Sequence, residues 1–131
     1  ARIGETGVDE ENITIMQYPN GAMASMFSGT RLATSQEATI TGTAGILRVN
    51  RHFYSGDTLT LTPRDETARG IDVTETRIIT EETDPNGFIY QVQEVNACLR
   101  AGQLESTVMP LDETLTIMET LDRIASRWQR E

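Results

Sequence analysis

Three ring side chains stand next to one another at His52, Phe53 and Tyr54, in a chain whose aromatic content is only 5%. Neighbouring residues of a strand face opposite sides of a sheet, so Phe53 and Tyr54 cannot both enter the same core. One of the two rings is therefore expected to be exposed or to line a pocket. The alternative is that one ring packs in the core and the other covers the edge of the sheet.

The sequence gives little support for a metal-binding site or for a catalytic nucleophile. His52 is the only histidine and Cys98 the only cysteine, and one histidine with scattered carboxylates does not form a zinc or iron pattern. We expect His52 to be a partly exposed strand or loop residue. Cys98 is expected to be a small buried residue on the inner side of a helix. The adjacent acids at positions 9–11 are expected in a solvated loop, without an acid–base role.

A dinucleotide site requires a glycine-rich turn between a strand and a helix, where backbone N–H groups receive the pyrophosphate. The chain has no G-x-G-x-x-G motif. Its nearest equivalent, Gly42-Thr43-Ala44-Gly45, joins two runs that both have the period of a strand. We therefore predict a strand-to-strand turn at this position and no cofactor-binding residue in the chain.

The elements that must position these residues change in type along the chain. The first two thirds have an apolar period of two, with turn residues between short runs, which predicts strands. Asn12–Tyr18 and Ala22–Ser28 should form a hairpin, because Asn20-Gly21 tolerates the backbone of a tight turn. The connections are too short for crossover helices, so we expect antiparallel pairing. Further strands are predicted at Glu37–Thr41, Gly45–Asn50 and Thr58–Thr62, with a weaker one at Val73–Thr80 within the poorly readable residues 63–87.

The last third has the period of a helix. Gly102 should end a first helix, whose apolar side consists of Phe88, Val92, Val95 and Leu99. A second helix should begin near Pro110, with Asp112 as a cap, and run to about Arg127. The predicted fold class is α+β: an open, largely antiparallel β-sheet with two C-terminal helices packed on one face.

Both faces of the predicted hairpin carry apolar side chains. Ile13 and Ile15 lie on one side, and Met16 and Tyr18 lie on the other. A sheet with one face in water should alternate more cleanly, so both faces are expected to be covered. Two helices can cover one face, and the other then requires a second subunit or another domain.

Charge and cysteine content limit the partners and the compartment. The net charge is −9, with 11 basic against 20 acidic residues, which argues against binding to nucleic acid or to an anionic membrane surface. A single cysteine excludes an internal disulfide and fits a reducing compartment, so a cytoplasmic location is expected. No apolar run approaches the roughly 20 residues that a membrane span needs.

Two segments resemble a known family. The first runs from Gly7-Val8-Asp9 through the hairpin tip at Tyr18-Pro19-Asn20-Gly21 to the Gly42–Gly45 turn. The second runs from Tyr90-Gln91-Val92 through Cys98 and Gly102 to Glu105-Ser106 and Met109-Pro110-Leu111. Together they resemble the C-terminal domain of the Gfo/Idh/MocA oxidoreductases, most closely its dihydrodiol dehydrogenase-like branch. The resemblance extends over nearly the whole chain.

The resemblance implies a division of labour within a longer enzyme. An N-terminal Rossmann domain, expected to be absent from residues 1–131, would bind NAD or NADP and supply the catalytic Glu-Lys-Pro lysine. No position here matches those motifs, so no catalytic residue is assigned and the isolated segment is expected to be inactive. An aromatic residue after the glycine turn contributes to the substrate wall in this branch, which indicates Tyr54, with Phe53 beside it. One sheet face makes the subunit contact in many members, and the candidate contacts here are Arg2, Ile13, Ile15, Met16, Tyr18, Met23 and Phe27.

Two functional classes follow. In the first, the chain is one domain of an NAD(P)-dependent oxidoreductase for a sugar, polyol or diol, and serves dimerisation and substrate shaping. Its partners would be its own Rossmann domain and a second copy of itself. In the second, it is a stand-alone acidic protein-interaction domain without catalytic activity. The Gly-rich loop and Glu-Lys-Pro motif of a preceding domain would distinguish them.

Overall fold

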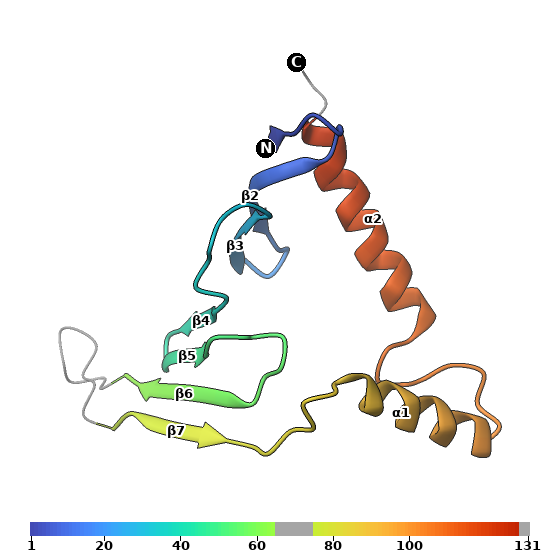
Figure 1. The fold of residues 1–131 in the computed structure, drawn as a ribbon. Helices are drawn as coiled ribbons and strands as arrows, with labels where there is room; N and C mark the ends of the chain where they lie inside the picture. Colours follow the sequence, from blue (N-terminus) through green and yellow to red (C-terminus); the bar gives the residue numbers. More distant parts are fainter. Residues whose placement is uncertain (65–74, 129–131) are drawn as a thin grey trace. The chain divides into compact units, whose positions relative to one another are not determined.

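The computed structural model describes residues 1–64 and 75–128. Strands precede two helices along the chain, as Figure 1 shows: β1 (Arg2–Ile3), β2 (Asp9–Gln17), β3 (Met23–Gly29), β4 (Ala38–Gly42), β5 (Gly45–Val49), β6 (Thr58–Pro63), β7 (Arg77–Thr80), α1 (Phe88–Arg100) and α2 (Leu111–Trp128). Neighbouring strands pair antiparallel throughout. The predicted α+β class is confirmed.

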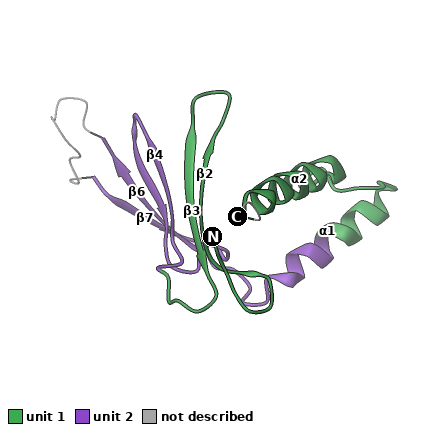
Figure 2. Ribbon diagram, turned by 90° about the horizontal axis from the view of Figure 1, so that it is seen from above, with its two compact units in different colours: residues 1–34, 94–131 green, residues 35–93 purple. Residues whose placement is uncertain are grey.

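The strands are divided between two open sheets, with the orders β1-β2-β3 and β4-β5-β6-β7. Residues 30–37 separate β3 from β4 and join no strand, so the two sheets are not paired at this point. The chain forms two compact units, residues 1–34 with 94–131 and residues 35–93, which are coloured separately in Figure 2. Neither described helix combines the length and the apolar character that a bilayer span requires.

The hairpin of β2 and β3 forms where the sequence predicts it. Ile13 pairs with Phe27 and Gln17 with Met23, in an uninterrupted register. At the tip, the Tyr18 N–H donates to the Ala22 carbonyl at 2.9 Å, and Gly21 has a φ of 86°. Glycine populates this left-handed region without steric penalty, which explains the tight turn.

The acidic cluster at positions 9–11 does not lie in a loop, contrary to the prediction. These residues begin β2, and Glu11 pairs with Arg2 across the ladder. The Glu10 carboxylate forms an ion pair with the Arg31 guanidinium at 2.6 Å. The Glu11 carboxylate forms one with the Arg2 guanidinium at 3.2 Å. The arginines neutralise the charges that made this segment look like a solvated loop.

The second sheet begins with the predicted strand-to-strand turn. Gly42 pairs with Gly45 at the tip of the β4–β5 hairpin, which confirms the predicted strand-to-strand turn. The strand expected at Val73–Thr80 corresponds to β7, and Val73 and Thr74 lie outside the described residues. One face of this sheet is aliphatic, with Ala38, Ile40, Leu47, Val49, Leu59, Leu61 and Ile79.

Gly45→Ala should destabilise the second sheet by about 2 kcal/mol. Gly45 has a φ of 150°, and a Cβ there would overlap the carbonyl oxygen of Thr62 in β6. The measurement is the urea midpoint at constant m-value. Gly42→Ala is the matched control in the same turn, because a Cβ there first meets an atom at 3.9 Å. Equal midpoints for the two variants would contradict this account.

The two helices lie close to their predicted bounds. The Asn86 side chain accepts a hydrogen bond from the Phe88 N–H at 3.3 Å and so caps the start of α1. At the other end, Gly102 has a φ of 67°, and the Gln103 N–H donates to the Cys98 carbonyl at 2.9 Å. This left-handed ending was predicted from Gly102. The second helix ends at Trp128, one residue beyond the predicted Arg127.

The cap of α2 is Glu105, where Asp112 was predicted. The Glu105 carboxylate accepts a hydrogen bond from the Leu111 N–H at 2.7 Å. Asp112 lies in the first turn of the helix itself. A carboxylate at this end also interacts favourably with the helix dipole.

Removing this cap with Glu105→Ala should lower the free energy of unfolding by about 1 kcal/mol. Glu113→Ala is the control, because it removes an acidic residue from the first turn of α2 without removing the Glu105 hydrogen bond. Urea unfolding of both variants separates the hydrogen bond from the charge. If Glu113→Ala costs as much as Glu105→Ala, charge near the helix end accounts for the whole effect.

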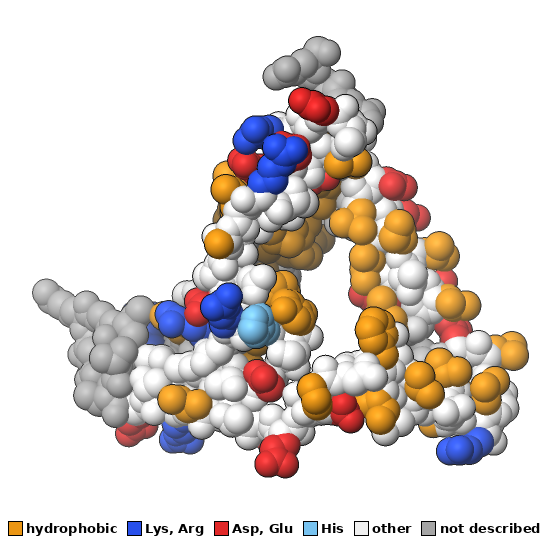
Figure 3. Space-filling model, in the orientation of Figure 1, with side chains coloured by type: hydrophobic (Ala, Val, Ile, Leu, Met, Phe, Trp, Pro, Cys, Tyr) orange, Lys and Arg blue, Asp and Glu red, His pale blue; other side chains and the backbone are white. Residues whose placement is uncertain are grey.

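Few apolar side chains are buried within the described chain. Cys98 is 8% exposed, whereas large apolar residues of both helices and of the first hairpin are mostly exposed. Figure 3 shows hydrophobic side chains at the surface along α1 and α2.

Candidate functional site

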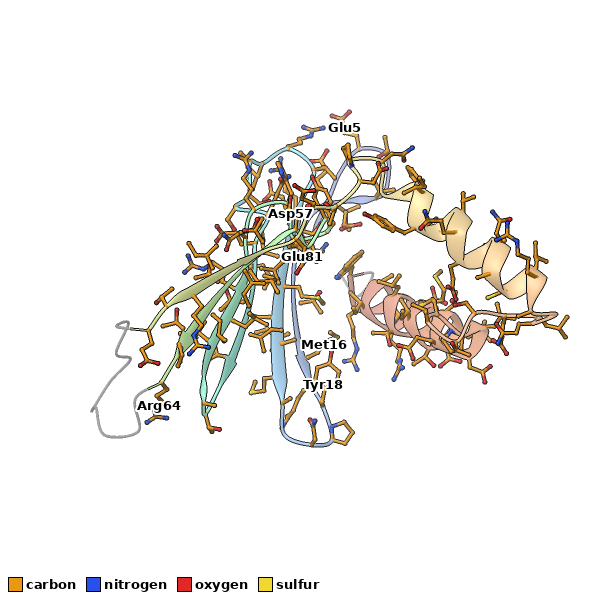
Figure 4. The ribbon with its side chains drawn as sticks, turned by 90° about the horizontal axis from the view of Figure 1, so that it is seen from below. Glu5, Met16, Tyr18, Asp57, Arg64 and Glu81 are labelled. Atoms are coloured by element: carbon orange, nitrogen blue, oxygen red, sulfur yellow. The ribbon has the colours of Figure 1, made fainter. Side chains whose placement is uncertain are left out.

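The candidate site is the loop between β5 and β6, which carries His52, Phe53 and Tyr54. Asn50 closes the loop at its base: its N–H donates to the Thr58 carbonyl at 3.0 Å, and its side chain accepts from the Thr60 hydroxyl at 3.0 Å. Asp57 closes the other end, where its carbonyl accepts from the Glu81 N–H at 2.9 Å; both side chains are labelled in Figure 4. Hydrogen bonds of Asn50 and Asp57 therefore hold the two ends of the short loop that carries the three ring side chains.

Two residues with left-handed backbones shape this loop. His52 has a φ of 66° and Gln36 a φ of 55°, and in the described ranges no other residue except glycine has a positive φ. The Phe53 N–H donates to the Gln36 carbonyl at 3.0 Å, which ties the two together. The Ser55 N–H and hydroxyl both reach the His52 carbonyl at 2.8 Å.

The rings form one exposed cluster. The Phe53 and Tyr54 ring centroids are 5.8 Å apart in an edge-to-face arrangement, and the His52 and Tyr54 centroids are 5.7 Å apart. Phe53 is 50% exposed and Tyr54 is 72% exposed. The prediction that at least one ring is exposed is confirmed. The alternative with one ring buried in a core does not hold, because both rings are at least half exposed.

The predicted dimer residues lie on two different faces of the first hairpin. The register places Ile13, Ile15, Met23 and Phe27 on one face, which we call the bare face. Ile13 and Ile15 are 70% and 69% exposed there. Arg2 is in β1 and pairs with acids of its own chain. The predicted contact set therefore combines residues of two faces, which the period of two already distinguished.

Met16 and Tyr18 lie on the opposite face and, together with Ile13 and Ile15 of the same strand, line a groove of about 880 Å³ within the first unit. Figure 4 shows both side chains on the side of the hairpin that faces α2. The helical side of the groove consists of Thr116, Thr120, Arg123, Ile124, Arg127 and Trp128. No sequence signal linked the helical residues Ile124 and Trp128 to the hairpin.

Glu105 and Ser106, which belong to the second segment that resembles the family, form hydrogen bonds within and beside the connection between α1 and α2. The Ser106 hydroxyl donates to the Glu94 carboxylate at 2.5 Å and accepts from the Val108 N–H at 3.0 Å. The Cys98 thiol lies 3.6 Å from the same Glu94 oxygen. Burial, together with Glu94, raises the pKa of the Cys98 thiol. The thiol form is favoured, and Cys98 is a buried packing residue, as predicted.

Comparison with known proteins identifies one group of relatives. The trans-1,2-dihydrobenzene-1,2-diol dehydrogenase of Xenopus tropicalis is 29% identical over 119 residues, which cover 90% of this chain and 35% of that protein. Proteins of the same name from Mus musculus and Homo sapiens are 28% and 26% identical, over 92% of this chain and 35% of their own length. No family model and no solved structure matches the chain.

The chain spans about a third of the length of the curated relatives it matches, and the similarity extends over most of its own length. The similarity includes both the strand region and the helical region described above. The resemblance to the dihydrodiol dehydrogenase-like branch of the Gfo/Idh/MocA oxidoreductases is thereby confirmed, and this chain is related to one segment of those enzymes.

Proposed function

We propose that this chain is a C-terminal domain of an oxidoreductase that acts on a diol or on a related polyol or sugar. The observation that carries the proposal is the 26–29% identity to dihydrodiol dehydrogenases over about nine tenths of the chain. The domain would contribute part of the substrate pocket and the subunit contact. A cytoplasmic location is part of the proposal and is supported by the single, unpaired cysteine.

The described residues do not fit a dinucleotide. The glycine turn at 42–45 joins two antiparallel strands, and no helix begins there to receive a pyrophosphate. We therefore propose that NAD or NADP binds to an N-terminal Rossmann domain of the same protein. No chemical step is assigned to residues of this chain.

Tyr54 and Phe53 are the proposed substrate contacts. Two exposed rings held edge to face offer an apolar surface on which the carbon skeleton of a cyclic substrate can lie. The hydrogen bonds that fix the loop at Gln36 and Ser55 hold these rings before any ligand binds. Such pre-organisation lowers the entropic cost of binding.

The bare face is the proposed subunit contact. Its four large apolar residues are exposed together, which is the composition of a surface that another protein covers. A homodimer through this face agrees with the two-fold, self-complementary contacts that most oligomers use. Arg2, Met16 and Tyr18 lie outside this face and are retained as proposed contacts only at its margins.

The proposed function is tested with the full-length protein, trans-1,2-dihydrobenzene-1,2-diol and either NAD⁺ or NADP⁺. Oxidation of the diol is expected, with the reduced nicotinamide followed by its absorbance. A cyclic sugar and an acyclic polyol serve as comparison substrates. Absence of turnover with every substrate, in a folded protein that binds neither dinucleotide, would favour the stand-alone interaction domain.

A further inference from the structure

The strained backbone at His52 is the feature that the proposed function leaves unexplained. A non-glycine residue with a positive φ is uncommon, and here two such residues, His52 and Gln36, meet through the Phe53 N–H. Strain of this kind persists only where surrounding contacts over-determine it, and it concentrates at functional sites. Ser55 supplies those contacts, with two hydrogen bonds to the His52 carbonyl.

The consequence of this backbone is the position of the imidazole. The His52 ring lies 5.7 Å from the Tyr54 ring at an interplanar angle of 42°, so the imidazole stands at the edge of the aromatic cluster. It is exposed, and no residue in the described ranges hydrogen-bonds to either of its ring nitrogens. A polar group with free donor and acceptor capacity therefore stands beside two apolar rings.

We propose that His52 is a substrate-binding residue that hydrogen-bonds a hydroxyl group of the substrate ring that lies on Tyr54. The inference rests on the proposed function, since it takes Tyr54 as part of the substrate wall. It specifies the ligand further, as a cyclic compound with a hydroxyl next to the reacting carbon. A neutral imidazole has one donor and one acceptor nitrogen, which matches a hydroxyl group that can accept or donate.

A hydrogen bond from His52 would also explain how the site distinguishes a diol from a mono-alcohol. An apolar surface alone distinguishes poorly between a diol and a mono-alcohol of the same carbon skeleton. A site that hydrogen-bonds a substrate hydroxyl selects against the analogue that lacks it. His52 would therefore determine the preference for a diol, whereas Tyr54 and Phe53 would hold the carbon ring.

The test compares His52→Gly and His52→Asn in the full-length protein. Glycine adopts a φ of 66° without strain, so the first variant removes the imidazole and keeps the backbone. Asparagine also tolerates this region and retains a hydrogen-bonding side chain. The substrates are a cyclohexane diol with adjacent hydroxyls and cyclohexanol, with Tyr54→Ala measured in parallel.

In His52→Gly, kcat/KM for the diol should fall roughly tenfold, mainly through KM, whereas kcat/KM for cyclohexanol should stay within about twofold. His52→Asn should recover most of the loss. The imidazole proton signals of His52, identified in NMR by their loss in His52→Gly, should also shift when the diol is titrated into the wild-type protein.

Equal losses for both substrates, or imidazole signals that do not respond to the diol, would overturn the role of His52. A loss of diol turnover in Tyr54→Ala without any change in His52→Gly would overturn it too, while the proposed function stands. A wild-type protein that oxidises neither substrate, or a Tyr54→Ala variant equal to wild type, would instead remove the substrate wall on which the inference rests.

Discussion

Replacing Ile15 with aspartate in the full-length protein should convert the proposed dimer into monomers. Ile15 lies on the bare face with Ile13, Met23 and Phe27, and its side chain is freely accessible in a single chain. A dimer through this face would bury the new carboxylate without a partner. Burying a charge without a partner costs about 3 kcal/mol or more of the free energy of dimerisation. This cost weakens the dimer at least roughly a hundredfold. Light scattering at several protein concentrations measures the change.

Val108→Asp is the matched control for this experiment. Val108 is a similarly exposed aliphatic residue in the connection between the helices, and its replacement introduces the same charge. Ile13→Ala provides a milder variant that removes apolar area without a charge and should weaken the dimer by about tenfold. Unchanged dimers in both Ile15→Asp and Ile13→Ala would contradict the bare-face contact. Monomers in Met16→Asp alone would move the contact to the groove side of the hairpin.

Local sequence patterns were sufficient for the elements of this fold. The alternation from Asn12 to Tyr18 and the Asn20-Gly21 turn fix the first hairpin and its register, because both are properties of neighbouring residues. The glycines at 42 and 45 likewise predicted a hairpin turn. Gly102 marked the end of α1, since its left-handed conformation is a local requirement of a helix ending.

Contacts between residues distant in sequence were not predictable in the same way. Glu10 lies in β2, and its carboxylate pairs with Arg31, some twenty positions later in the chain. Glu105 caps α2 from outside the helix, whereas the capping preference pointed to the nearer Asp112. The left-handed backbone at His52 is next to the Phe53 N–H that bonds to the Gln36 carbonyl, and neither a histidine nor a glutamine requires such a conformation. The site is therefore assembled by tertiary hydrogen bonds that a one-dimensional pattern does not contain.

The exposed apolar surface of the first hairpin was predictable from the sequence only in part. Period two indicated that both faces of the first hairpin are apolar, and the exposures of Ile13 and Ile15 agree with this. The pattern could not assign an occupant to each face, because alternation carries no information on what lies opposite. In the structure, Met16 and Tyr18 line a groove with α2, whereas Met23 and Phe27 of the bare face are not among its lining residues.

Removing the Tyr54 ring should have the largest effect on activity of any single change in this chain. Tyr54→Ala in the full-length protein deletes the most exposed ring of the cluster, which is the surface proposed to receive the substrate. Burial of an aromatic side chain contributes about 1.5–3 kcal/mol, so kcat/KM should fall roughly ten- to a hundredfold. The dissociation constants of NAD⁺ and NADP⁺ should not change, because this chain is proposed to make no contact with either.

Tyr54→Phe is the control that separates the ring from its hydroxyl group. It keeps the edge-to-face contact with Phe53 and the contact with His52, and no hydrogen bond of the Tyr54 hydroxyl to a described residue is lost. Its kcat/KM should therefore remain within about twofold of wild type if the ring is an apolar wall. A phenylalanine variant as impaired as the alanine variant would mean that the hydroxyl group acts on the substrate. Weaker dinucleotide binding in Tyr54→Ala would instead place Tyr54 beside the cofactor, because a substrate wall has no reason to alter that affinity.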